Sequence, residues 1–198
     1  MRKAQSVMPD AMQAIDYSQR LLDPRGWIHS ADSLLAAARL LEIEIEKQWS
    51  EVVSEGGQIV STSGRTEVHG PYFLLVAYAL ENFFKAARVC AERPRLRNRL
   101  ITAIPSFLKE HDLLNLSSAA RLSVSLEEED LLRRLSRNSV WAGRYPVPTG
   151  PSAARAVEQY SDGRVYLTAY FAPADAAHLR RLVARIRAHA LESIEGAA

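Results

Sequence analysis

The chain has 198 residues, of which 47% are hydrophobic and 24% charged, and its formal net charge is +2. This composition is typical of a globular protein with one domain and appendages, which excludes wholesale disorder. The near balance of 25 basic and 23 acidic residues disfavours a histone-like electrostatic binder but leaves room for a local basic patch. No apolar run approaches the roughly 18 to 20 residues of a membrane-spanning helix, and no secretory signal pattern follows Met1. We therefore expect a cytoplasmic protein that does not bind a membrane.

Six segments carry apolar residues at spacings of three and four, the pattern of a helix with one buried face. Ser30 is a predicted N-cap, Pro71 suits a first helical turn, and Ser125 with Glu128 forms a capping-box pattern. The segment after Pro71 is apolar around more than half of its circumference, so we expect it to be the central helix. The predicted helices cover residues 10–22, 30–54, 72–91, 111–122, 125–138 and 173–194.

The segments between these helices are rich in glycine, proline and charge. Residues 55–70 are predicted as a loop rather than a hairpin, and Arg93-Pro94 is predicted to end the central helix. Residues 140–151 contain too much proline and glycine for regular structure, residues 152–159 predict a short helix, and residues 164–171 predict a strand with no obvious partner.

Together these elements predict an all-α, up-and-down bundle of about five main helices with a long C-terminal helix. We divide the chain into three parts. Residues 1–28 are an N-terminal extension, residues 29–148 are the bundle, and residues 149–198 are a C-terminal extension whose amphipathic helix packs on the bundle.

Several catalytic and cofactor motifs are absent from the sequence. It has no GxxxxGK[ST] phosphate loop, no GxGxxG turn and no GxSxG elbow. The five histidines include no HxH or HExxH pattern, and a single cysteine cannot build a cysteine-rich metal site. That cysteine, Cys90, lies on the predicted central helix, where we expect a buried thiol rather than a nucleophile. We therefore expect no metal and no cofactor.

Basic residues crowd between residues 88 and 99, where five arginines are accompanied by one acid, Glu92. With three arginines of the 125–138 helix they could frame a phosphate-binding surface. No aromatic residue lies between Arg93 and Arg99, which disfavours stacking on a single-stranded nucleic acid. The interpretation we favour is a solvated loop whose cations offset the dipole of a helix C-terminus. The arginines are Arg88, Arg93, Arg95, Arg97, Arg99, Arg133, Arg134 and Arg137.

Trp141, Arg144 and Tyr145 lie on a turn that Gly143 and two prolines fix. A rigid turn with aromatic and arginine side chains can bind an anion or a planar ligand. The competing interpretation, which is slightly favoured, is that Trp141 and Tyr145 pin the chain against the bundle. Both interpretations can hold together, because an anchored turn would also hold Arg144 in place.

Three motifs, in this order, resemble the HEPN superfamily of helical bundles. The first is Ala79–Ala86 (ALENFFKA), similar to that family's ALExxxKA helix. The second is His111–Leu116 (HDLLNL), similar to its HDLxxL helix start, and the third is Ala142–Pro146 (AGRYP), similar to its RYP turn. The resemblance covers residues 30–148 and leaves the last fifty residues outside.

The resemblance implies an up-and-down bundle of four or five helices, often a homodimer. Many members cleave RNA as toxins or defence effectors, while others bind nucleotides or serve as accessory subunits. The ribonuclease members carry an Arg and a His separated by four to six residues, but Arg25/His29, Arg65/His69 and Arg185/His189 have only three residues between them and lie outside the matching helix. His111 as acid or base and Arg144 as phosphate clamp remain the catalytic candidates.

We predict a non-enzymatic, HEPN-like module that binds RNA, a nucleotide-like ligand or a partner protein, in a toxin–antitoxin or defence system. In its predicted site Glu81 and Lys85 form an i,i+4 ion pair and Arg144 meets an anion. The alternative is a metal-independent ribonuclease that uses His111 and Arg144. A third interpretation is a structural dimer module whose C-terminal helix docks a partner through Leu179, Leu182, Ile186 and Ile194. The predicted site residues are Glu81, Asn82, Lys85, His111, Trp141, Arg144 and Tyr145.

Overall fold

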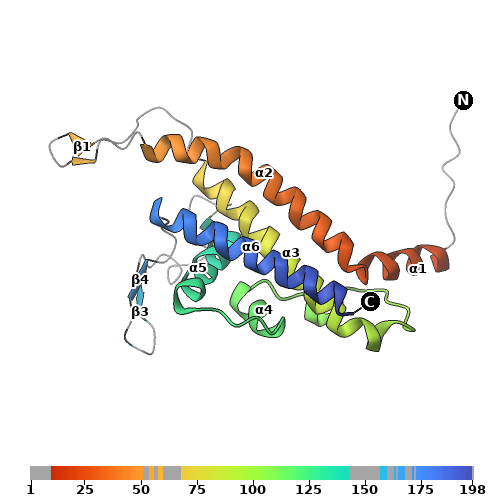
Figure 1. Ribbon diagram of the computed structural model, residues 1–198. Coiled ribbons are helices and arrows are strands. Elements are labelled where there is room, and N and C mark those ends of the chain that lie inside the picture. The colour runs from red at the N-terminus through yellow and green to blue at the C-terminus, as the bar shows by residue number, and fades with distance from the viewer. Residues whose placement is uncertain are drawn as a thin grey trace, which may run out of the picture.

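The computed structural model describes residues 10–50, 54–55, 58–59, 68–142, 157–159, 163, 165–167, 171 and 173–197. Within these residues the chain forms six α-helices around one main core, which confirms the predicted all-α bundle with a long C-terminal helix (Figure 1). The helices are α1 (Asp10–Leu21), α2 (Pro24–Ser50), α3 (His69–Leu96), α4 (Leu113–Ala119), α5 (Leu126–Arg137) and α6 (Pro173–Glu195). The short elements are a 3₁₀ turn η1 (Ser106–Leu108), a π-helical turn η2 (Asn138–Ala142), and strands β1 (Ser54–Glu55), β2 (Gln58–Ile59), β3 (Val157–Gln159) and β4 (Val165–Leu167).

The central helix is α3, as its apolar circumference predicts. α2 runs antiparallel beside it, and α4, α5 and α6 cover its other sides (Figure 1). Leu80, Phe83 and Phe84 of α3 are completely enclosed. Each large apolar side chain buried in this way contributes about 1.5–3 kcal/mol relative to an exposed one, so the packing around α3 is a main source of stability.

α2 begins six residues before the predicted N-cap, so the predicted start at Ser30 is wrong. Pro24 occupies the first helical position, where its fixed φ suits the helix and its missing N–H costs nothing. Asp23 Oδ1 accepts a hydrogen bond from the N–H of Arg25 at 3.0 Å and caps the first turn. The hydroxyl of Ser30 instead donates to the carbonyl oxygen of Gly26, one turn earlier. The predicted boundary between residues 28 and 29 therefore falls inside α2.

The predicted ends of two helices also need correction. α3 continues through Pro94 to Leu96, because the proline stands in the last turn and Leu96 packs against a smaller core cluster that contains Leu21 and Val89. α4 is shorter than the predicted 111–122 helix, since Asp112 caps it and Arg121 adopts a left-handed conformation with φ of 59° just beyond its end.

The capping box that the sequence predicts at the start of α5 is present. The Ser125 hydroxyl accepts from the N–H of Glu128, and the Glu128 carboxylate accepts from the N–H of Ser125. At its other end α5 passes directly into η2, although residues from 140 onward were expected to be irregular. The remainder of that segment, residues 143–151, lies outside the described residues, as do residues 152–156 of the predicted 152–159 helix.

Two short antiparallel strand pairs correct the predicted connections. β1 pairs with β2, although Ser54 of β1 was predicted to end the 30–54 helix and the residues after it to form a loop. β4 pairs with β3, so the predicted strand at residues 164–171 has a partner, and that partner occupies the end of the predicted 152–159 helix. Glu158 lies opposite Tyr166 in this pair. A strand needs a neighbour to satisfy its backbone, and the helical periodicity of a few residues cannot reveal it.

The apolar stripe of α6 belongs to the core of the same subunit. Leu179, Leu182 and Ile186 are almost completely buried, and Ile194 is partly buried against the same cluster. This burial contradicts the interpretation in which the stripe docks a partner. It agrees with the predicted packing of α6 on the bundle. No helix in the described part of the chain combines the length and apolarity needed to cross a membrane.

Candidate functional site

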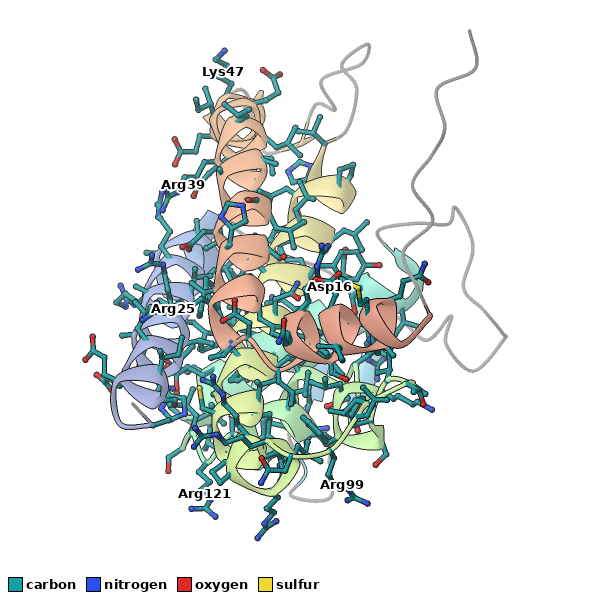
Figure 2. The ribbon with its side chains drawn as sticks, turned by 90° about the vertical axis from the view of Figure 1, so that its right-hand side faces the viewer. Asp16, Arg25, Arg39, Lys47, Arg99 and Arg121 are labelled. Atoms are coloured by element: carbon teal, nitrogen blue, oxygen red, sulfur yellow. The ribbon has the colours of Figure 1, made fainter. Side chains whose placement is uncertain are left out.

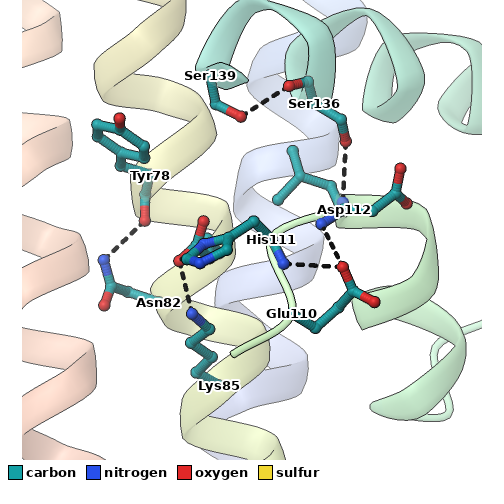
Figure 3. A network of polar contacts seen from close by, with 10 residues as sticks. Tyr78, Asn82, Lys85, Glu110, His111, Asp112, Ser136 and Ser139 are labelled. Carbon is teal, nitrogen blue, oxygen red and sulfur yellow. Dashed lines mark hydrogen bonds and ion pairs between the residues drawn. The ribbon is translucent and has the colours of Figure 1, made fainter. Parts of the chain in front are cut away.

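Three of the predicted site residues meet around one carboxylate oxygen. Lys85 Nζ donates to Glu81 Oε1 at 2.6 Å, and His111 Nδ1 lies 3.0 Å from the same oxygen (Figure 3). The Lys85 side chain is only 4% exposed, whereas the His111 side chain is 65% exposed. The Glu81–Lys85 ion pair predicted from the i,i+4 spacing is therefore enclosed. Its neighbour His111 is the member of the cluster that is exposed to solvent.

Local structure explains how His111 reaches α3. The Glu110 carboxylate accepts hydrogen bonds from the N–H groups of His111 and Asp112, at 2.9 and 2.8 Å. Asp112 then caps α4, and the N–H of Leu113 donates to the Ser136 hydroxyl on α5. These bonds fix the loop between η1 and α4 from both sides (Figure 3), so the imidazole is held beside Glu81.

The contact sets the orientation of the imidazole. Nδ1 faces Glu81, and no described residue forms a hydrogen bond with Nε2. A carboxylate that orients a histidine in this way supports proton transfer at the other ring nitrogen. The same carboxylate oxygen also binds the Lys85 ammonium, so Glu81 is shared between two cationic or hydrogen-bonding partners.

The loop carries a pH-dependent contribution to stability. The N–H of Asp112 is the main cause that lowers the pKa of Glu110 below its ordinary value of 4.5, with further help from the N–H of His111 and the Asn115 amide. A carboxyl with a lowered folded-state pKa stabilises the protein above its unfolded-state pKa, and this contribution disappears as the pH falls through the folded-state pKa.

We therefore expect Glu110→Gln to be less stable than the wild type at pH 7, and we expect this difference to shrink between about pH 4.5 and pH 3. Urea unfolding at pH 7 and at pH 3 measures the difference in the free energy of unfolding. Glu192→Gln is the matched control, because Glu192 is exposed and forms no ion pair with a described residue. A difference that stays constant from pH 7 to pH 3 contradicts the assignment.

Trp27 is a neighbour of the site that the sequence analysis missed. Its ring centroid lies 6.0 Å from Lys85 Nζ, and its Nε1 donates to the carbonyl oxygen of Leu21. Trp27 also lines a shallow groove of about 350 Å³ together with Asn82 and Arg20. The signal available in the sequence is Asp23-Pro24, a capping residue followed by a proline that suits the first helical position, which places Trp27 on a helix rather than in an extension.

Of the remaining predicted site residues, the structure places the side chain of Asn82, and Asn82 is not part of this cluster. Asn82 lies on the same helix, but its amide donates to the carbonyl oxygen of Tyr78, at 2.7 Å (Figure 3). Trp141 lies in η2, and its side chain is outside the described residues, as are Arg144 and Tyr145. The predicted phosphate clamp at Arg144 thus stays a prediction.

A second polar feature is the basic end of the molecule, which we define as Arg93, Arg97, Arg99, Lys109 and Arg121. All five side chains are exposed, and none forms an ion pair with a residue that the structure describes. Figure 2 shows Arg99 and Arg121 at the same end, far from Lys47. The C-terminus of α3 lies within this end, so these cations also face its dipole.

Arginines elsewhere on the described surface are mostly matched by carboxylates. Arg187 binds Asp32, Arg180 binds Glu42 and Glu46, and Arg185 binds Glu128. Arg185 and His189, one of the Arg/His pairs in the sequence, both join α6 to the α4–α5 region. Arg185 binds Glu128, and His189 Nε2 lies 2.8 Å from the carbonyl oxygen of Ala120. Unmatched positive charge is therefore concentrated at the basic end.

The structure also places the remaining reactive side chains. Cys90 is buried, and burial raises the pKa of its thiol, as expected of a core cysteine. In the ranges that the structure describes, no three His, Cys, Asp or Glu side chains gather as a metal site would require.

Comparisons of the chain with protein-family models, with curated proteins and with solved structures find no match. The HEPN resemblance stays a prediction from three sequence motifs. What the geometry adds is that two of these motifs meet in space, through the contact between His111 and Glu81.

Proposed function

We propose that this protein is a non-enzymatic, HEPN-like module that binds RNA, with the basic end holding the phosphates. The observation that carries the proposal is the concentration of five exposed cations that have no carboxylate partner among the described residues, in a chain whose net charge is only +2. Phosphate contacts by lysine and arginine supply most of the affinity in sequence-independent RNA binding. Arginine suits this task because its guanidinium binds phosphate oxygens in pairs.

The position of the basic end also supports a path for an RNA strand toward the cluster of Glu81, Lys85 and His111. Lys109 belongs to the basic end and lies two residues before His111, on the loop that runs back along α3 to Glu81. An RNA strand on the basic end would thus pass near the exposed imidazole. A nucleotide-like ligand or a partner protein, the other partners that the sequence predicts, would use fewer of these cations.

RNA binding tests the proposal directly. We expect a labelled single-stranded RNA to bind in EDTA with salt-dependent affinity, and Arg97→Glu/Arg99→Glu to weaken binding about 10- to 100-fold at low salt. Removing two phosphate contacts should also reduce the salt slope by about 1.4. The readout is fluorescence anisotropy at several salt concentrations.

The matched control is Arg39→Glu/Arg181→Glu, which makes the same change in net charge at two exposed arginines outside the basic end. Arg39 lies far from Arg99 and Arg121 (Figure 2). Equal weakening by both double variants would contradict a localised RNA site. If the basic end only offsets the α3 dipole, its variant loses stability without any loss of RNA affinity.

A second candidate function is metal-independent cleavage of RNA. The observation that favours it is the His111–Glu81 contact, which leaves Nε2 of an exposed imidazole available to accept a proton from a ribose hydroxyl. Cleavage in EDTA that is lost in His111→Ala and reduced in Glu81→Gln supports this candidate. RNA that stays intact during binding supports the non-enzymatic module, and sedimentation of the same protein tests the homodimer that the resemblance implies.

A further inference from the structure

A groove lies between α2, α3 and α6. Its volume is about 470 Å³. Leu35 of α2, Val76 of α3 and Val183 of α6 contribute apolar surface to its walls and floor. This volume lies within the range of small-molecule sites, roughly 300–1,000 Å³, which are mostly apolar with a few placed polar groups.

Salt bridges tie the two outer walls of the groove together. Arg187 of α6 donates to both carboxylate oxygens of Asp32 on α2, at 2.8 and 2.9 Å. Further along, Arg180 of α6 binds Glu42 and Glu46 of α2, at 3.2 and 3.0 Å. These bonds join α6 to α2, and they pair both arginines with carboxylates.

Arg39 also lines the groove, and its guanidinium has no carboxylate partner among the described residues. It is exposed, projects from α2 into solvent (Figure 2), and forms no hydrogen bond or ion pair with a residue that the structure describes. Its field nevertheless reaches Asp32, whose pKa is lowered chiefly by the hydrogen bond from Arg187 and further by Arg39. Two guanidinium groups thus face one carboxylate at this end of the groove.

We propose that the groove binds a small organic carboxylate with an apolar tail. The ligand's carboxylate pairs with Arg39, and its tail lies on Leu35, Val76 and Val183. The charge pattern selects this class, since the Arg39 end has one unmatched positive charge beside an apolar floor. The positive charge of a cationic amphiphile would be repelled by Arg39. Acetate has no apolar tail, so it would make no contact with the floor of the groove. The proposal does not depend on RNA binding, because the proposed RNA site uses the cations of the basic end and not Arg39.

Titration calorimetry with decanoate, below its micelle concentration, tests the proposal on the full chain. We expect saturable binding at one site per chain, no binding of acetate, and no binding of decyltrimethylammonium. Arg39→Gln should weaken decanoate binding about 2- to 5-fold, the effect of losing one solvent-exposed ion pair. Arg181→Gln is the matched control, because Arg181 is exposed on α6, lies outside the lining of the groove and has no ion pair with a described residue.

A second variant tests the groove without touching charge. Ala184 lines the groove at an exposed position of α6, so Ala184→Trp should fill it and abolish decanoate binding while the thermal midpoint stays unchanged. Equal binding to wild type, Arg39→Gln and Ala184→Trp would overturn the proposal, as would equal binding of the cationic amphiphile. A concentration-dependent dimer that Ala184→Trp disrupts, seen by sedimentation, would overturn it in favour of a second copy of the chain as the occupant.

Discussion

Replacing Leu80 with alanine is expected to lower the free energy of unfolding by about 3 kcal/mol, within the range known for buried leucines. Leu80 lies in the middle of α3 and is 0% exposed, so its truncation removes apolar contacts and leaves a cavity that the surrounding helices close only in part. Alanine is the best helix former, so the loss arises from packing rather than from helix propensity. Urea unfolding followed by circular dichroism measures the change.

The matched control is Leu40→Ala, the same substitution at a position of α2 that is 72% exposed. We expect it to change the free energy of unfolding by no more than about 0.5 kcal/mol. Equal effects of the two substitutions would show that α3 is not the central helix. A large effect confined to Leu40 would show that this exposed face of α2 is buried against something in solution.

Glu81→Leu is the second substitution with a large expected effect. It leaves the Lys85 ammonium enclosed without its carboxylate, and breaking a buried ion pair by removing one partner costs about 3 kcal/mol or more. His111 loses the same partner, but its exposed ring can bind water instead. The expected result at pH 7 is a lowered urea midpoint with an unchanged dependence on denaturant concentration.

The rescue variant distinguishes a buried charge from a general loss of packing. Glu81→Leu/Lys85→Met removes both charges, and we expect it to recover most of the lost stability because apolar replacement of a buried ion pair is often neutral. Glu92→Leu is the control on the same helix, since Glu92 pairs with the arginines Arg88 and Arg95 at distances of 3.5 and 3.6 Å and is more exposed. A double variant no more stable than Glu81→Leu contradicts the explanation.

Several parts of this protein were predictable from short stretches of sequence. The apolar stripes of α3 and α6, the capping box at Ser125 and the helix start at Pro173 follow from residues at most four positions apart. The spacing of Glu81 and Lys85 likewise gave their ion pair. These features depend on local backbone geometry, which each segment largely carries with it.

Other features depended on segments that are distant in the sequence. His111 reaches Glu81 across 30 residues, and β3 finds β4 only when both are placed by the fold. Trp27 lies beside the Lys85 ammonium, and it belongs to a helix that begins at Pro24, earlier than its apolar pattern indicated. Spacing along the chain could propose these residues as a site but could not decide which of them touch.

The sequence by itself determined that the chain is an all-α bundle, which helix is central, and which residue types are available for binding. Only the tertiary structure decided which charges are matched. Arg187 and Arg180 bind carboxylates across a groove, whereas Arg39 and the basic end have no carboxylate partner in the part of the chain that the structure describes. The physical reason is that helical periodicity and capping act over one turn, while ion pairing and burial depend on how whole helices pack against each other.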